Sequence, residues 1–145
     1  MASGDDVLAQ IRRANERFYR AFESLEMAQM EAIWVQAERA KCIHPGWDIL
    51  VGWETIRKSW QAIFASTDYI RFVITDVSVH VYNRVAWVTC VENLSDDPAI
   101  LDMMRILTTN VYEYNGTDWC IVHHHASPIM RHIPASGEQS QETLN

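Results

Sequence analysis

Apolar residues in the first half of the chain recur at intervals of three and four, which is the spacing of amphipathic helices. The pattern predicts a helix over residues 5–25, preceded by capping side chains that begin at Ser3, and a shorter helix over residues 27–36. A third helix is predicted over residues 54–64. Residues 41–46 are typical of a short strand that ends in a Pro-Gly turn.

The second half of the chain has the composition of strands. Residues 69–82, 85–94, 103–114 and 119–126 are rich in valine, isoleucine, threonine and aromatic residues, and short polar turns separate them. A run of helices followed by a run of antiparallel strands predicts the α+β class, with the helices packed on one face of the sheet.

Length and composition fit one globular domain. The chain has 145 residues, of which 48% are hydrophobic and 21% are charged, as in ordinary globular proteins. We expect a single domain over residues 1–133. Residues 134–145 are almost entirely polar and predict a tail outside the core.

Charge and cysteine content exclude several classes of protein. The net charge is −7 and the basic residues are scattered, which argues against a nucleic-acid partner. The chain shows no apolar run of membrane-spanning length and no signal sequence at its start, so no membrane partner is expected. The three cysteines form no CxxC pair. We therefore expect a cytoplasmic protein with reduced thiols.

Three segments carry a family resemblance: CIHPGW at residues 42–47, GWETI at residues 52–56 and WCIVHHHAS at residues 119–127. With the order of helices and strands, they resemble the nuclear transport factor 2-like superfamily over about residues 5–130, and more closely its SnoaL-like and ketosteroid-isomerase-like branch. The closing strand is also similar to the calcium/calmodulin-dependent kinase II association domain. The resemblance implies a cone-shaped fold, with three N-terminal helices packed on a strongly curved, mainly antiparallel sheet around a pocket.

Strand alternation and the resemblance together select a polar pocket wall. Alternation places Glu92 on one face of its strand with the apolar residues at positions 86, 88 and 90. The resemblance implies that this face looks into the pocket, together with Thr108, Asn110 and Tyr112 on the next strand. A carboxylate in an apolar cavity has a raised pKa and can act as a general acid or base. The alternative is that Glu92 only completes a buried hydrogen-bond network.

His44 stands at the end of the first strand, where the resemblance to ketosteroid isomerase implies the carboxylate base of that enzyme. A histidine there can still move protons near neutral pH. The helix position that would carry the oxyanion-stabilising tyrosine is matched by Phe18, with Tyr19 one step round the helix. The isomerase set of an aspartate base, a tyrosine and a protonated acid is therefore absent, and that specific activity is not expected.

The triple histidine of the last predicted strand suggests either a pocket wall or a metal site. Alternation puts His123 and His125 on one face, which we expect to line the pocket, and turns His124 away. His125 is a candidate catalytic residue and His123 a candidate ligand contact. A metal would need a further ligand such as His44 or Glu92. We predict that no metal binds.

Trp47, Trp53 and Trp60 flank the strand end and the third helix that would form the mouth of the pocket. Aromatic walls suit flat, apolar ligands. For Trp60, at helical spacing, packing in the core is an equally strong interpretation.

These features predict a pocket protein for a small, partly apolar molecule, which the resemblance implies is a homodimer. If it is an enzyme, we expect an isomerase, cyclase or dehydratase that works by proton transfer without an organic cofactor, since no nucleotide-binding motif is present. The alternative is a non-catalytic module for self-association or ligand sensing.

Overall fold

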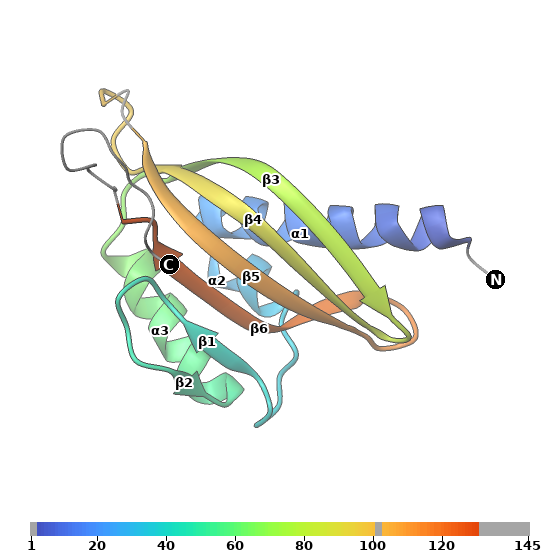
Figure 1. The fold of residues 1–145 in the computed structure, drawn as a ribbon. Coiled ribbons are helices and arrows are strands. Elements are labelled where there is room, and N and C mark those ends of the chain that lie inside the picture. Colours follow the sequence, from blue (N-terminus) through green and yellow to red (C-terminus); the bar gives the residue numbers. More distant parts are fainter. Residues whose placement is uncertain (1–2, 101–102, 131–145) are drawn as a thin grey trace.

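A computed structural model describes residues 3–100 and 103–130, and it confirms the α+β class (Figure 1). The predicted tail at residues 134–145 lies outside the described residues. The elements in chain order are α1 (Gly4–Ser24), α2 (Met27–Glu31), β1 (Lys41–Ile43), β2 (Leu50–Val51), α3 (Trp53–Ala65), β3 (Arg71–Tyr82), β4 (Val85–Ser95), β5 (Met104–Tyr114) and β6 (Trp119–Pro128).

The strands form one sheet in the order β2-β1-β6-β5-β4-β3. Neighbouring strands are antiparallel except β1 and β6, which run parallel. Helix α1 lies along one face of the long strands, and α3 lies beside β1 and β2 (Figure 1). The helices and the curved sheet thus enclose the core between them, as the predicted architecture requires. No helix within the described ranges is long and apolar enough to cross a membrane.

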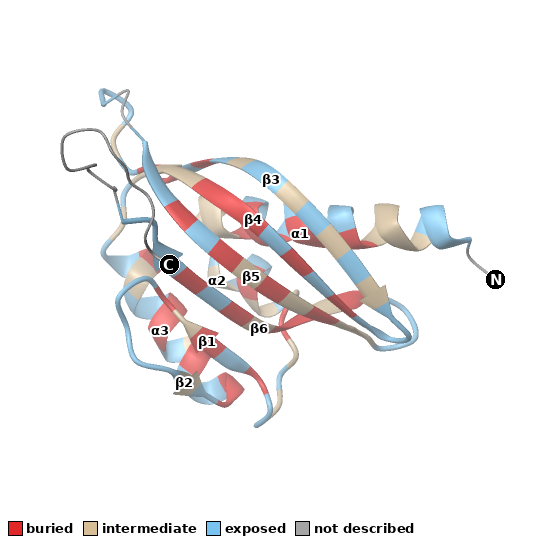
Figure 2. Cartoon of the chain, viewed as in Figure 1, coloured by how far each residue is buried: buried red, intermediate tan, exposed pale blue. Residues whose placement is uncertain are grey.

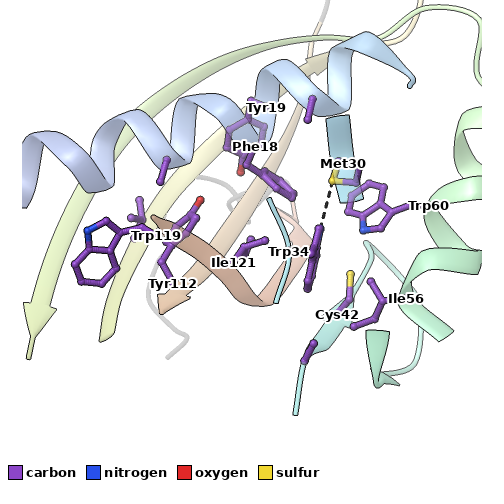
Figure 3. Close-up of a cluster of buried hydrophobic side chains, with 14 of the residues drawn as sticks. Phe18, Tyr19, Met30, Trp34, Cys42, Ile56, Trp60, Tyr112, Trp119 and Ile121 are labelled. Atoms are coloured by element: carbon purple, nitrogen blue, oxygen red, sulfur yellow. Dashed lines mark hydrogen bonds between the residues drawn. The ribbon is translucent and has the colours of Figure 1, made fainter. Parts of the chain in front are cut away.

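The face of the sheet toward α1 is buried, and Figure 2 shows the alternation along the long strands. On β4 the predicted inward residues Ala86, Val88, Cys90 and Glu92 are all buried. Figure 3 shows the core cluster, in which Tyr19 from α1 and Tyr112 from β5 lie among apolar side chains. The core therefore contains polar atoms at its centre, and each of them needs a partner.

Helix α1 begins at a capping box and buries a stripe that is not wholly apolar. The Ser3 hydroxyl accepts from the Asp6 N–H at 3.1 Å, and the Asp6 carboxylate accepts from the Ser3 N–H at 3.4 Å. The helix ends where Leu25 takes a left-handed conformation. Asn15 and Tyr19, four residues apart, are buried in the same stripe as the apolar side chains. Both side chains therefore face the sheet.

The second helix is shorter than predicted. It ends at Glu31, and not near residue 36, because the following residues pair with β6. The Val35 N–H donates to the Ile121 carbonyl at 2.8 Å, and the Ile121 N–H donates to the Ile33 carbonyl at 2.9 Å. Tertiary pairing has overridden helical periodicity here.

Two irregularities interrupt the long strands. The register between β3 and β4 shifts between Thr75 and Ser78, where Asp76 has a φ of 55°. The register between β5 and β6 also shifts: Tyr112 pairs with Ile121 and Val111 with His123, so Val122 is an extra residue. Such a bulge reverses which side chains face inward beyond it.

Candidate functional site

A cavity of about 220 Å³ lies between the helices and the concave face of the sheet. Most of its wall is apolar, and the polar contributions come from His44, Glu92 and His124, together with the indole of Trp47. Trp47 is 46% exposed, whereas His44, Glu92 and His124 are at most 3% exposed. The cavity therefore has an aromatic mouth and a buried polar end. The lining comprises Phe22, His44, Pro45, Trp47, Ile63, Phe72, Glu92, Leu94, Met104, Ile106 and His124.

Glu92 is held at the buried end by one short hydrogen bond. The Tyr19 hydroxyl donates to Glu92 Oε2 at 2.6 Å. Burial raises the pKa of Glu92 to about 7 and outweighs the hydrogen bond from Tyr19, which favours the carboxylate. Burial and the nearby Glu92 charge raise the pKa of Tyr19 well above its ordinary value, so Tyr19 stays protonated and keeps donating. Glu92, with Tyr19 as its hydrogen-bond donor, is therefore a carboxyl group that can gain or lose a proton near neutral pH.

A buried amide network orients Tyr19. Asn110 Nδ2 donates to the Tyr19 hydroxyl oxygen at 3.2 Å and to Asn15 Oδ1 at 3.0 Å. The Tyr112 hydroxyl donates to the same Asn15 oxygen at 2.7 Å. Because the oxygen of Tyr19 is already accepting, its own proton points to Glu92. The predicted residues Asn110 and Tyr112 thus act on Glu92 through Tyr19 and do not line the cavity.

The inward histidine of β6 is His124, so the predicted orientation of the triple histidine is wrong. His124 is 1% exposed and lines the cavity, whereas His123 is partly exposed and His125 is exposed. The cause is the bulge at Val122, which shifts the alternation by one residue. His123 and His125 do share a face, with ring centroids 6.3 Å apart, but it is the face opposite the cavity.

The contacts of His124 fix its tautomer. His124 Nδ1 lies 2.6 Å from Asn110 Oδ1, which is an acceptor, so Nδ1 carries the proton. Burial, and then the neighbouring His44, hold the pKa of His124 well below its ordinary value. The ring is therefore neutral at physiological pH. Its other nitrogen, Nε2, is a bare acceptor in a side chain that lines the cavity.

His44 is neutral and also presents an acceptor. Its Nε2 lies 2.8 Å from Ser59 Oγ, and the Ser59 hydroxyl donates its proton to the Ile56 carbonyl at 2.6 Å. Nε2 must therefore donate to Ser59, which leaves Nδ1 unprotonated and able to accept from the Cys42 thiol, whose sulfur lies 3.9 Å away. Burial lowers the pKa of His44 to about 4. Its ring centroid lies 6.3 Å from that of His124.

The three predicted tryptophans occupy different places. Trp47 lines the mouth of the cavity. Trp60 is fully buried and packs edge-to-face against His44, with ring centroids 4.7 Å apart. Trp53 is buried against Trp34 with a centroid distance of 5.9 Å and is not part of the cavity wall. For Trp53 the structural interpretation, packing in the core, is therefore the one that the contacts favour.

Thr108 is buried on β5 opposite Cys90 and lies outside the cavity wall. Its hydroxyl oxygen has no hydrogen-bond partner among the residues that the structure describes. In the same part of the chain, no group of three or more histidine, cysteine, aspartate or glutamate side chains comes together in a way that could hold a metal ion.

Sequence reasoning missed Asn15, Tyr19 and His124. For the helix residues a signal existed, because both stand four residues apart within the apolar stripe of α1, where a polar side chain needs a buried partner. For His124 no signal existed, because nothing in a single sequence marks Val122 as a bulge. The completed site combines a proton-exchanging carboxyl, a tyrosine donor and two neutral histidines around a small cavity.

Comparison with known proteins agrees with the fold. Residues 11–131 match the SnoaL-like domain family. A candidate dehydratase of the NTF2-like family from Streptomyces avermitilis is 32% identical, with a TM-score of 0.83, over 89% of this chain and 100% of that one. A candidate calcium/calmodulin-dependent protein kinase type II association domain from Thiobacillus denitrificans is 29% identical, with a TM-score of 0.76, over 81% of this chain and 93% of that one.

A longer plant protein contains a similar segment. The F-box protein SKIP8 of Arabidopsis thaliana is 28% identical over 116 residues, which is 80% of this chain and 48% of that protein. The chain thus spans about half the length of this relative. Together with the matched range and the fold, these likenesses show that the chain belongs to the SnoaL-like domain family of the NTF2-like superfamily.

Proposed function

We propose that the protein binds a compact, partly apolar molecule in the cavity and that Glu92 transfers a proton to or from it. The reaction class is isomerisation, cyclisation or dehydration without an organic cofactor. The observation that carries the proposal is the 2.6 Å hydrogen bond from Tyr19 to a carboxylate that lines an apolar cavity. A general acid or base works best when its pKa lies near the working pH, and the pKa of Glu92 is about 7.

The surroundings of Glu92 favour chemistry over a purely structural network. A buried carboxyl that only completed a network would gain from hydrogen bonds to both oxygens. Here Oε2 is held by Tyr19, and no hydrogen bond within the described ranges engages Oε1. The likeness to a candidate dehydratase supports the same reaction class.

In the proposed reaction, the ionised Glu92 removes a proton from a carbon next to a carbonyl group, and the protonated form returns it to another atom or to a leaving hydroxyl. Tyr19 donates to Glu92 throughout, which stabilises the ionised form before and after the transfer. The apolar wall excludes water from the reacting atoms.

Proton exchange in D₂O tests this proposal without knowledge of the natural product. Single-ring ketones that carry a hydroxyl group are incubated with the full chain, and NMR records the loss of protons next to the carbonyl. We expect protein-dependent exchange that rises with pH through about 7. It should be lost in Glu92→Gln and retained in Glu113→Gln, a matched change at an exposed ion pair. Equal exchange in the two variants would contradict the role of Glu92.

A non-catalytic module for association is the second candidate, and one surface favours it. The sheet face opposite the cavity exposes large apolar side chains on three neighbouring strands: Val73, Tyr82, Trp87 and Leu107 are between 39% and 71% exposed. A homodimer that covers this face would bury them. Light scattering of the parent and of Trp87→Lys tests this: a dimer that becomes a monomer supports it, and a parent that is already monomeric contradicts it.

A further inference from the structure

The hydrogen-bond donors of the buried amide network are used within the protein, whereas the Trp60 indole N–H and the Thr108 hydroxyl, which lie outside the cavity wall, have no partner among the described residues. Tyr112 and Asn110 donate to Asn15, and Asn110 also donates to Tyr19. Tyr19 in turn donates to Glu92. Each donor of this network is therefore used within the protein.

The two cavity histidines also use their ring protons within the protein. His44 donates its ring N–H to Ser59, and His124 donates its ring N–H to Asn110. The other nitrogen of each ring is an acceptor: Nδ1 of His44 lies 3.9 Å from the Cys42 thiol, and Nε2 of His124 has no hydrogen-bond partner among the described residues. Together with Glu92 Oε1, which the described residues leave without a hydrogen bond, the lining side chains of the buried end hold two unpaired acceptors.

The remaining lining side chains add no hydrogen-bond donor at the buried end of the cavity. No lysine or arginine is among them. The one further polar side chain is Trp47, whose indole N–H belongs to a side chain that is 46% exposed at the mouth, where water competes for it. A site that offers only acceptors in its desolvated part recognises a donor and leaves an acceptor-only ligand facing unpaired lone pairs.

We propose that the cavity selects a single-ring ligand that carries a hydroxyl or amino hydrogen-bond donor, and that it rejects carboxylates and ligands whose polar atoms only accept. This inference rests on the proposed function, because it names the class of molecule that the same cavity takes. The size limit follows from the volume of about 220 Å³, since a cavity of about 150 Å³ already holds a benzene ring.

Benzyl alcohol and anisole form a matched pair for the test, because they are isomers that differ in whether the oxygen carries a proton. NMR titrations of the full chain, at about pH 8.5 so that Glu92 is ionised, compare these two with benzoate and toluene. We expect benzyl alcohol to bind about tenfold more tightly than anisole, and benzoate to bind most weakly. Shifts of the Trp47 indole and of the His124 ring locate the binding.

The variant Glu92→Gln makes the test more specific, because it replaces one acceptor of the cavity with a donor. Tyr19 still donates to position 92, so the glutamine oxygen must face Tyr19 and its amide donor must face the cavity. The preference for benzyl alcohol over anisole should fall about tenfold, while Glu113→Gln should keep the parent's preference. An undiminished preference in Glu92→Gln would contradict the assigned acceptors.

The outcomes separate this inference from the proposed function. If anisole or benzoate shifts the cavity resonances and binds as tightly as benzyl alcohol, the cavity is a ligand site and the donor rule alone is wrong. If none of the four compounds shifts Trp47 or His124, the donor rule and the proposed ligand cavity both fail.

Discussion

The hydroxyl of Tyr19, on α1, donates a 2.6 Å hydrogen bond to Glu92 Oε2, on β4, in the interior of the protein. The bond joins the first helix to the centre of the sheet across 73 positions of the chain. It holds a carboxyl group that burial alone would keep protonated at neutral pH. The pair therefore links the stability of the fold to the chemistry of the cavity.

Glu92→Gln should stabilise the protein in alkaline solution. Folding raises the pKa of Glu92 from 4.5 to about 7, so the folded state binds this proton more tightly than the unfolded state. The resulting penalty is absent below about pH 4.5 and grows to about 3 kcal/mol above pH 7. Urea denaturation should show the variant more stable than the parent at about pH 8.5 and similar to it at about pH 4.5. A variant that is less stable at alkaline pH would contradict the buried, ionised carboxylate.

Tyr19→Phe and Tyr112→Phe should differ in how their cost depends on pH. Both remove a buried hydroxyl, but only the Tyr19 hydroxyl donates to Glu92. A hydrogen bond to a charged group contributes about 1.5–3 kcal/mol and a neutral one about 1 kcal/mol. Tyr19→Phe should therefore cost more at about pH 8.5 than at about pH 4.5, while the cost of Tyr112→Phe stays constant. Parallel pH profiles for the two variants would rule out the assigned bond.

His124→Ala and His125→Ala test the reversed orientation of the last strand. Removing His124 opens a cavity and leaves Asn110 Oδ1 unpaired, which should cost about 2–4 kcal/mol. His125 is exposed, and its removal should stay within about 0.5 kcal/mol. Thermal or chemical unfolding of the two variants decides between the orientations, and the opposite ranking would restore the one expected from simple alternation.

The acid side of the stability profile should depend on His44. Folding lowers the pKa of His44 from 6.5 to about 4, so the unfolded state takes up this proton first as the pH falls. The native state loses stability from about pH 6.5 toward pH 4, by about 1.4 kcal/mol per pH unit for one such group. In His44→Gln the stability should fall less steeply between about pH 6.5 and pH 4. Urea denaturation at several pH values in this range measures the difference. A loss of stability in His44→Gln as steep as that of the parent would contradict the lowered pKa of His44.

The architecture could be predicted because it follows from local patterns. Helical spacing marks α1 and α3, and strand composition marks the four long strands, whose bounds lie within two residues of the predicted ones. The pairing that ends α2 at Glu31 could not be predicted in this way, because it depends on the distant residue Ile121.

The site could be predicted only in part, for a physical reason. Glu92 lies on a regular stretch of β4, so alternation placed it correctly on the inward face. His124 lies beyond the bulge at Val122, where alternation fails by one residue. Tyr19 is separated from Glu92 by 73 positions, about half of the chain, and their contact depends on how α1 packs on the sheet, which periodicity does not encode.

The most direct test is a titration of the Glu92 carboxyl carbon by ¹³C NMR in protein with labelled glutamate, with Glu92→Gln used to assign the resonance. The parent should titrate with a pKa of about 7. In Tyr19→Phe the pKa should be higher, because the hydrogen bond that favours the carboxylate is gone. A parent resonance that titrates near 4.5, the ordinary value for glutamate, would contradict a carboxyl group poised for proton transfer in this cavity.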